Sequence, residues 1–488
     1  MRPTVRFLTD DLIKQIIDEA VNILCSIGLK IHNKQILSML ADHQARIDMD
    51  NFHVNLTEEI IQKSIKTAPR SFKLYDVMGN QTHDFSDYNV YFTPGSTALN
   101  ILDSQTQRMR KPLTNDYIDF SKIIAQLENF ASTSTAFIAT DVHEKISDSY
   151  RLFLSLLYCE KPVVTGAFTA ESFAVMKDFL LAVRQSEKAL KEKPLAIFSC
   201  CPTSPLKWCE VTSQNLIDCA RDSIPVEIIA VPLSGFMSPV TLTGSLIQHT
   251  AENLSGIVIS QLINPGTPVL YGGSPAIFDI RYETTPMGAI ETMMLDCAFN
   301  EIGKYLNLPT QAYISMSDAK MLDAQAGMES GMGATLAVLA GINSISGPGM
   351  IDFESCQSLE KLVLDNEMCG MTLRLIDGIT PRDDFPALPI FQELLREKHL
   401  LIAEHTTRHR HKEIFFPGPA IDRANRERWK QQGAMDLNAR LHNEVNKLLK
   451  TYQPSTLPET TKKDLVKLME KDARRHGQDH LPLPPMTP

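Results

Sequence analysis

Five short runs that each open on a proline decide the fold: PVVTGAF at 162–168, PLAIFSCCP at 194–202, PVEIIAVP at 225–232, PVLYGG at 268–273 and PTQAYISMSDAK at 309–320. Proline lacks the N–H group that a sheet ladder needs, so it is tolerated as the first residue of a strand. The Val, Ile, Tyr and Thr residues that follow favour extended backbone. Because the runs are almost continuously apolar, they predict parallel strands buried on both faces.

The spacing of these runs predicts how the strands connect. Their starts lie 32, 31, 43 and 41 residues apart, which is room for the strand, helix and loops of a βα unit. Runs at 131–142 and 342–351 extend the series to at least seven units, and the natural closure is a (β/α)8 TIM barrel. The eighth strand has two candidates, 89–92 and the stretch after Asp365. A doubly wound open sheet is the alternative, although no glycine-rich dinucleotide turn follows any of the strands.

The chain of 488 residues divides into three predicted parts. Residues 1–128 read as an N-terminal α+β extension that caps the barrel, beginning with a helix capped by Thr9. Residues 129–385 form the barrel core, and residues 386–488 form a C-terminal helical extension and a proline-rich tail. We expect these C-terminal helices either to wrap the barrel or to build an oligomer contact.

Composition narrows the classes of partner. The formal net charge is −10 and the basic residues are dispersed, which argues against nucleic acid and anionic membranes. The nine cysteines lack CxxC spacing and fit a reducing compartment. No stretch approaches the roughly 20 apolar residues of a membrane span, and charges interrupt the N-terminal region. We therefore expect a cytoplasmic protein without a signal peptide or an anchor.

Reactive groups in a barrel lie at the carboxyl ends of the strands. The segments there are poor in His and rich in Gly, Ser, Pro, Phe and Met. Cys200 and Cys201 with Cys209 come closest to a zinc site, but adjacent residues point to opposite faces of a strand. The HRHKE run at 409–413 is interpreted as a solvated basic patch. No bound metal is predicted.

The same segments suit a small organic cation. Aromatic rings attract a quaternary ammonium without a hydrogen bond, and Arg281 can pair with a carboxylate in a bidentate fork. The segment 317–329, SDAKMLDAQAGME, adds polar groups at the mouth of an apolar pocket. The alternatives are core roles for the aromatics, a surface or stabilising ion pair for Arg281, and a helix cap for Ser317 or Asp318. The predicted substrate-binding residues are Tyr271, Phe278, Arg281, Tyr313, Ser317, Asp318, Lys320, Gln325 and Met350; no catalytic residue is assigned.

Several long motifs resemble the trimethylamine methyltransferase family. They are SPVTLTGSLIQHTAENLSGIVISQLINPGTPVLYGGSP at 238–275, SMSDAKMLDAQAGMESG at 315–331, GINSISGPGM at 341–350 and LDNEM at 364–368. The similarity extends over roughly 8–454. Members of this family have a (β/α)8 barrel and transfer a methyl group to the cobalt of a separate corrinoid protein. This chain has only standard residues, so it is similar to the branch without pyrrolysine, whose usual substrates are methylated amines of the betaine type.

The resemblance implies a methyltransferase of one-carbon metabolism and methylotrophy. It would move a methyl group from a quaternary amine such as glycine betaine to the Co(I) of a partner corrinoid protein. The chain itself lacks the corrinoid-binding motif DxHxxG, so the corrinoid is expected from the partner. A quaternary ammonium leaves as a neutral tertiary amine, and no general acid is required. Three alternatives stay open: a tertiary methylamine as substrate, a barrel enzyme of another type such as a metal-dependent lyase, and a non-catalytic barrel binding protein.

Overall fold

A computed structural model describes residues 2–383 and 385–484. Parallel strand pairings join eight short strands in a closed cycle, which we call the strand ring. One sheet contributes β9, β10, β11, β13 and β15, and a second contributes β17, β18 and β6. Parallel bridges between Tyr271 and Thr310 and between Phe92 and Phe130 join the two sheets at both edges. In ring order the strands are β6 (Tyr91–Thr93), β9 (Thr133–Ser134), β10 (Val163–Thr165), β11 (Ala196–Cys200), β13 (Val226–Ala230), β15 (Val269–Gly273), β17 (Gln311–Tyr313) and β18 (Ser344–Ser346).

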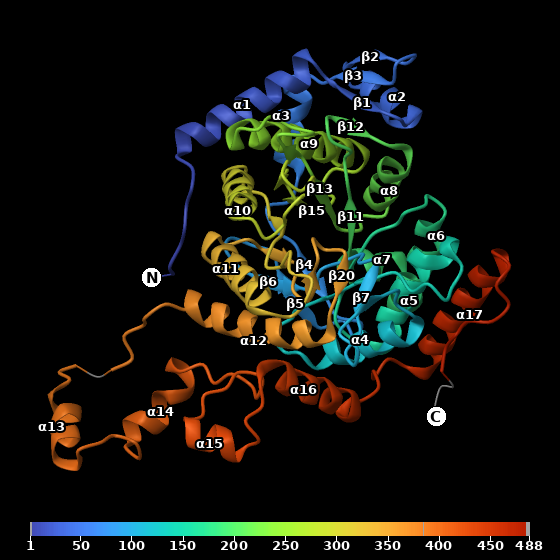
Figure 1. The fold of residues 1–488 in the computed structure, drawn as a ribbon. Helices are drawn as coiled ribbons and strands as arrows, with labels where there is room; N and C mark the ends of the chain where they lie inside the picture. Colours follow the sequence, from blue (N-terminus) through green and yellow to red (C-terminus); the bar gives the residue numbers. More distant parts are fainter. Residues whose placement is uncertain (1, 384, 485–488) are drawn as a thin grey trace.

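Helices follow every ring strand along the chain and surround the strands (Figure 1). The alternation of strands and helices confirms an α/β protein with parallel strands. The helices are α4 (Thr114–Gln126), α5 (Ser147–Tyr158), α6 (Ser172–Arg184), α7 (Glu187–Glu192), α8 (Glu210–Arg221), α9 (Leu242–Ile263), α10 (Ile290–Tyr305), α11 (Ala324–Ala340) and α12 (Leu359–Ile376).

The five proline-opened runs contain β10, β11, β13, β15 and β17, and the two added runs contain β9 and β18. The eighth ring strand, β6, overlaps the 89–92 candidate. The other candidate was wrong, because the chain after Asp365 continues helix α12. Asp365 accepts a hydrogen bond from Lys361 Nζ at 2.5 Å, and both side chains are buried. Side chains four residues apart are neighbours on a helix surface, so this pair is typical of a continuous helix.

In the N-terminal segment, α1 and α3 pack against the outer helix α9, and the β4–β5 hairpin closes the amino end of the ring. Helix α1 begins after Thr9, whose side chain accepts a hydrogen bond from the Leu12 N–H at 3.3 Å as predicted. The β4–β5 hairpin packs Phe72, Leu74 and Phe85 against the ring residues Val164, Ile197 and Leu270. The elements are α1 (Asp10–Ser26), β1 (Leu29–Ile31), α2 (Lys34–Asp42), β2 (Arg46–Asp48), β3 (His53–Asn55), α3 (Glu58–Thr67), β4 (Lys73–Tyr75) and β5 (Gln81–Asp84).

Short strands and one 3-10 helix lie in the segments between the ring strands and the helices that follow. The pairs β14–β16 and β7–β20 are parallel and connect neighbouring segments at the carboxyl ends. These elements are β7 (Asn100–Leu102), β8 (Met109–Arg110), η1 (Glu144–Ile146), β12 (Lys207–Trp208), β14 (Leu233–Ser234), β16 (Ala276–Ile277), β19 (Met350–Ile351) and β20 (Cys356–Gln357).

The C-terminal region contains two kinds of helix. Helix α16 packs against α4 and α12, and α17 packs against α5 and α6. These two helices therefore wrap the body, which is one of the two arrangements expected from the sequence. Helices α13, α14 and α15 project from the body instead (Figure 1). Residues 485–488 of the predicted tail lie outside the described residues. The C-terminal helices are α13 (Leu388–Glu397), α14 (Glu404–Glu413), α15 (Arg426–Gln431), α16 (Leu437–Thr451) and α17 (Glu459–Arg475).

The division into three domains stays a prediction. β6 and α4 fall within residues 1–128, yet β6 pairs with β18 inside the strand ring. The region assigned to the N-terminal extension therefore supplies part of the ring. Across the described ranges 2–383 and 385–484, every helix is too short or too polar to cross a membrane.

Candidate functional site

The interior of the strand ring holds a buried polar cluster. Glu227 lies on β13, is fully buried, and accepts a hydrogen bond from Ser199 Oγ on β11 at 2.6 Å. Tyr313 lies on β17, and burial together with nearby Glu227 raises the pKa of its hydroxyl well above the usual value. Strand β15 lies between β13 and β17 in the ring. The side chains of Glu227 and Tyr313 therefore approach each other inside the ring, across β15.

Two further groups complete the cluster. Glu354 and Cys201 also raise the pKa of Tyr313, after the contributions of burial and Glu227, which places both near its hydroxyl. Cys201 follows β11, and Glu354 lies between β19 and β20. We call Ser199, Cys201, Glu227, Tyr313 and Glu354 the polar cluster.

Buried polar atoms in and beside the ring lack hydrogen-bond partners among the described residues. They are Oε2 of Glu227, Nε2 of Gln311, Oγ of Ser346 and both amide atoms of the Gln357 side chain. An unpaired buried polar group costs about 1–3 kcal/mol, and native proteins contain few of them. Several in one region indicate a site that a ligand or water completes.

The two carboxyl groups of the cluster have pKa values near neutral pH. Burial raises the pKa of Glu227 to about 7, and the hydrogen bond from Ser199 offsets part of that rise. Burial also raises the pKa of Glu354 to about 8, partly offset by the backbone N–H of Ser96. Carboxyl groups whose pKa is strongly shifted by burial are typical of functional sites. A bound cation would favour their ionised form.

A strained loop carries Glu354 to the cluster. Asp352, Phe353 and Glu354 are three successive non-glycine residues with φ of +52°, +55° and +69°. Such left-handed residues cost of the order of 1–3 kcal/mol each and are concentrated at functional sites. The Asp352 N–H donates to the Ala319 carbonyl at 2.9 Å, and Lys320 Nζ lies 3.8 Å from the centre of the Phe353 ring. These contacts hold the loop in place.

Two of the predicted residues therefore lie at this site. Tyr313 is a member of the polar cluster, and Lys320 supports the loop that carries Glu354. Phe278 lies farther out, where its ring stacks on Phe236 at 4.8 Å between centroids. Phe236 is 62 % exposed, so this pair forms part of the rim instead of the interior.

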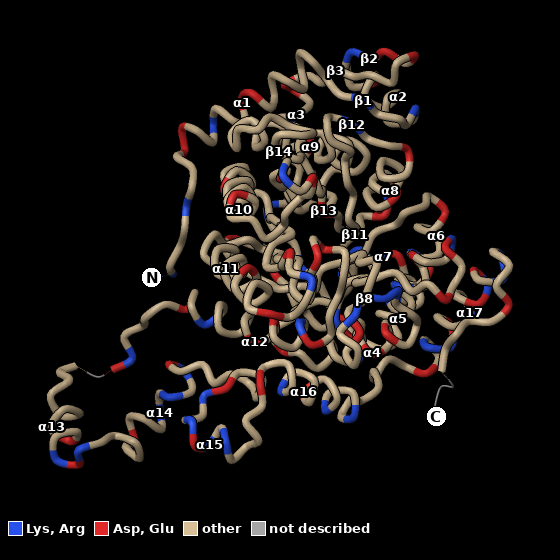
Figure 2. The backbone as a smooth tube through the Cα atoms, viewed as in Figure 1, with Lys and Arg blue, Asp and Glu red and all other residues tan. Residues whose placement is uncertain are grey.

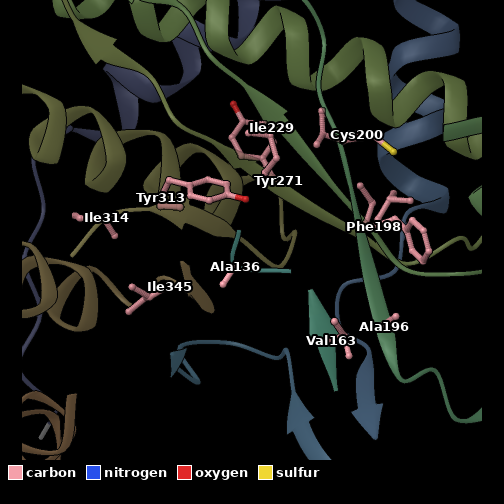
Figure 3. Close-up of a cluster of buried hydrophobic side chains, with 14 of the residues drawn as sticks. Ala136, Val163, Ala196, Phe198, Cys200, Ile229, Tyr271, Tyr313, Ile314 and Ile345 are labelled. Carbon is pink, nitrogen blue, oxygen red and sulfur yellow. The ribbon is translucent and has the colours of Figure 1, made fainter. Parts of the chain in front are cut away.

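Tyr271 points away from the polar cluster. It is fully buried, its ring packs against His249 on α9 and Phe299 on α10, and its hydroxyl donates to Thr250 Oγ1 at 2.9 Å. Figure 3 shows the opposite directions of Tyr271, toward the helix layer, and Tyr313, toward the centre of the ring. Since both the ring and the hydroxyl are occupied, this placement corresponds to the core role that the sequence left open.

Arg281 is engaged by its own loop. Its Nε and Nη2 donate to the two carboxylate oxygens of Asp279 at 3.0 and 2.6 Å, and the side chain is 76 % exposed. The bidentate fork expected for a substrate carboxylate is thus filled by a neighbouring residue. This geometry gives no support to a role in substrate binding.

The polar residues of segment 317–329 form a network beside the ring. Ser317 Oγ and Gln325 Nε2 donate to opposite oxygens of Glu329 at 2.6 and 2.8 Å. Asp318 accepts from the N–H groups of Met287 and Gly288 at 2.8 and 3.0 Å, and burial raises the pKa of its carboxyl to about 6. The network fastens the loop before α10 to the start of α11.

The residue that caps α11 is neither of the two that were expected, and Met350, the last of the predicted binding residues, is buried. Asp323, not Ser317 or Asp318, caps α11 by accepting from the N–H groups of Gln325 and Ala326 at 2.9 and 3.2 Å. Met350 is fully buried, and its Cγ would lie only 2.1 Å from a Cβ atom added to Gly95. It packs beneath the loop after β6.

The sequence reasoning missed Ser199, Glu227, Gln311 and Glu354. Glu227 and Gln311 carried a readable signal, because a carboxyl or amide group inside an otherwise apolar strand, PVEIIAVP or PTQAYIS, needs a partner or a function. Glu354 carried none, since its position depends on the strained loop. In residues 2–383 and 385–484, no three His, Cys, Asp or Glu side chains are arranged to hold a metal ion.

The chain is an α/β protein whose parallel strands enclose a polar cluster, an arrangement expected of an α/β enzyme. The family model described as trimethylamine methyltransferase matches residues 1–477, and the chain belongs to that family. This confirms the resemblance drawn from the motifs and the assignment to an enzyme family.

Named relatives cover nearly the whole chain. A trimethylamine methyltransferase of Desulfitobacterium hafniense is 28% identical over 469 residues, covering 96% of this chain and 94% of the relative. A glycine betaine methyltransferase of the same species is 27% identical over 457 residues, covering 93% and 94%. The crystal structure of the monomethylamine methyltransferase of Methanosarcina barkeri matches with a TM-score of 0.53 at 10% identity, covering 92% of this chain and 89% of that one. This likeness supports the fold.

We expect Glu227→Gln to stabilise the protein in a pH-dependent way. The folded pKa is raised from 4.5 to about 7, so the carboxyl group destabilises the folded state increasingly as the pH rises from about 4.5 to 7, by roughly 3 kcal/mol in full. Glutamine removes this cost and keeps an acceptor for Ser199. Thermal unfolding midpoints of both proteins should diverge between pH 5 and 7 and stay parallel above. Equal separation at every pH would contradict this, and Glu291→Gln, at an exposed position, is the control.

Proposed function

We propose that this chain is a (β/α)8-barrel methyltransferase that takes a methyl group from a quaternary amine of the betaine type and transfers it to the Co(I) of a separate corrinoid protein. The observation that carries the proposal is a pair of carboxyl groups beside Tyr313, the buried Glu227 and the half-buried Glu354. No Lys, Arg or His contributes to the pKa of either carboxyl group among the described residues. The cluster thus lacks a cation, which a quaternary ammonium would supply.

The strand pairings support the barrel. Eight parallel strands linked in a cycle, each followed by a helix, have the connectivity of a (β/α)8 barrel. The apolar hairpin residues Phe72, Leu74 and Phe85 close the amino end. Cys201, just after β11, and Glu354, after β18, lie at the carboxyl end, where enzymes with this fold place their sites, and Glu227 lies deeper in the ring, beside Leu270.

The proposed reaction is a nucleophilic displacement at a methyl carbon. The cobalt centre supplies the electron pair for the new bond, and the pair of the broken C–N bond leaves on the amine nitrogen, so no proton is needed. The residues of this chain would hold the positive nitrogen by charge and by the face of the Tyr313 ring. Fixing the C–N bond in line with the acceptor accounts for much of the acceleration that such a site can provide.

The experiment is a methyl-transfer assay with reduced cobalamin and a panel of glycine betaine, proline betaine, carnitine, butyrobetaine, choline and trimethylamine. At least one quaternary amine should methylate the corrinoid, and Glu227→Gln should lower kcat/KM by about 100-fold or more, because a buried charge pair is worth several kcal/mol. Glu291→Gln is the matched control. Measurable ligand binding without any methyl transfer would favour the non-catalytic barrel instead.

A tertiary methylamine is the second candidate substrate. The pKa values of about 7 and 8 for Glu227 and Glu354 would keep one of them protonated near neutral pH, so that it could give its proton to the amine nitrogen as the methyl group is transferred and dimethylamine leaves as a neutral molecule. The same panel separates the two substrates. With a quaternary amine, binding should strengthen from pH 6 to 9 as the carboxyl groups ionise, then level off.

Lys320 is proposed as the partner of a substrate carboxylate. Its ammonium group lies over Phe353 and 3.7 Å from Asp352, next to the loop that brings in Glu354, and the side chain is 56 % exposed. Lys320→Met should raise KM for a betaine roughly two- to five-fold, the range for a solvent-screened pair, and leave KM for choline or tetramethylammonium unchanged. Equal increases for both kinds of substrate would assign Lys320 a role in holding the loop alone.

A rim of exposed apolar side chains fits the proposed corrinoid partner. These side chains follow β14, β16 and β17 at the carboxyl ends, and they are Phe236, Val240, Ile280, Tyr282, Met321 and Met328. Large exposed apolar patches mark interaction sites, and a corrinoid ring with its protein needs an open apolar face. Phe236→Ser with Tyr282→Ser should raise KM for the corrinoid protein by about ten-fold or more while the rate with free cobalamin is kept. Loss of both activities, or of neither, would argue against this docking surface.

A further inference from the structure

The segment 385–433, which we call the arm, leaves its apolar side chains uncovered. It contains helices α13, α14 and α15, and none of these has a buried residue. In α13, Leu388, Phe391 and Leu395 recur at helical spacing along one side. The large apolar side chains of the arm that are at least 55 % exposed are Phe385, Leu388, Phe391, Leu395, Leu401, Ile402, Ile414 and Phe416.

The arm has a fixed root and a projecting tip. Glu367 Oε2 on α12 accepts from the Gly418 N–H at 2.7 Å, and Arg374 Nε donates to the Glu413 carbonyl at 3.2 Å. Beyond these contacts α13 and α14 extend away from the rest of the molecule (Figures 1 and 2). The root therefore presents the tip to a surface outside its own chain.

The arm needs a lasting partner. Isolated helices of about ten residues are marginal in water, and most helical stability in proteins comes from packing an apolar face. The eight exposed side chains together form the kind of surface that permanent interfaces bury. A carrier protein that must leave after each turnover would uncover them again, so a permanent partner suits the arm better.

Charge points to the kind of partner. The arm contains nine Lys or Arg against six Asp or Glu, a net charge of +3, whereas the rest of the chain carries −13. The arm and the rest of the chain thus carry net charges of opposite sign. A second copy of this chain offers an acidic body to a basic arm, and electrostatic complementarity of this kind guides specific association.

We propose that the arm docks on a second copy of this chain. Two copies related by a two-fold axis would each donate one arm and receive one, which closes the assembly without leaving an unpaired surface. The apolar side chains of the arm would lie at the centre of the contact, and the basic residues of α14 and α15 would face the acidic partner.

Sedimentation velocity of the full chain at micromolar concentration tests this proposal. The wild-type protein should sediment as a dimer that weakens at high salt. Phe391→Glu with Leu395→Glu should raise the dissociation constant at least about ten-fold, and so should the charge reversal Arg426→Glu with Arg428→Glu. Ile27→Glu, at a position 63 % exposed outside the arm, is the control and should leave the dimer intact.

Three results would overturn the proposal. A wild-type chain that stays monomeric, a dimer unaffected by both arm variants, or a monomer that sediments with phosphatidylserine vesicles through the arm would each do so. Hydrogen exchange of the wild-type chain provides a test that needs no variant. Amides of α13 and α14 should be protected in the dimer and lose that protection on dilution, whereas exchange independent of concentration would contradict docking.

Discussion

The closed cycle of parallel strand pairings is the constraint on which the rest of the structure depends. Parallel strands place all their carboxyl ends on one side, and closure through the bridges at Tyr271 and Phe92 leaves one shared interior. Side chains that alternate along each strand must therefore either meet inside the ring or pack under the helices. Tyr313 and Tyr271 illustrate the two outcomes on neighbouring strands, one beside Glu227 and the other beside His249 and Phe299.

The two ends of the ring interior differ in chemistry. At the amino end the hairpin residues Phe72, Leu74 and Phe85 make an apolar seal, whose burial favours the folded state. Glu227, which has an unpartnered carboxylate oxygen, lies next to this seal as the register partner of Leu270, and a loop with three successive left-handed residues lies at the other end. Both features are costly, and proteins keep such costs mainly where a function requires them. The packing of the seal and of the surrounding helices stabilises the folded state and offsets the unfavourable features of the site.

Five ring strands could be predicted from the sequence because each of them carries the same local signal, a proline followed by an apolar run. This signal depends only on backbone chemistry and burial. The site was less readable. Arg281 looked like a carboxylate receptor, but Asp279 two residues away satisfies it, and only the loop geometry reveals that. Glu227 was detectable as a charged residue within an apolar strand. Glu354 was not, since left-handed residues at 352–354 have no composition that distinguishes them from an ordinary turn.

Helix α12 supports both the site and the arm. In its first half, Asp365 pairs with Lys361 and accepts from the Gly349 N–H at 2.6 Å, which holds the loop after β18 beside Met350. Glu367 at the middle of the helix and Arg374 near its end hold the root of the arm. A buried ion pair that loses one partner leaves an uncompensated charge, so the position of α12 along its axis is tightly determined. Covering the arm with a second copy would therefore fix the same helix that positions the carboxyl end of β18.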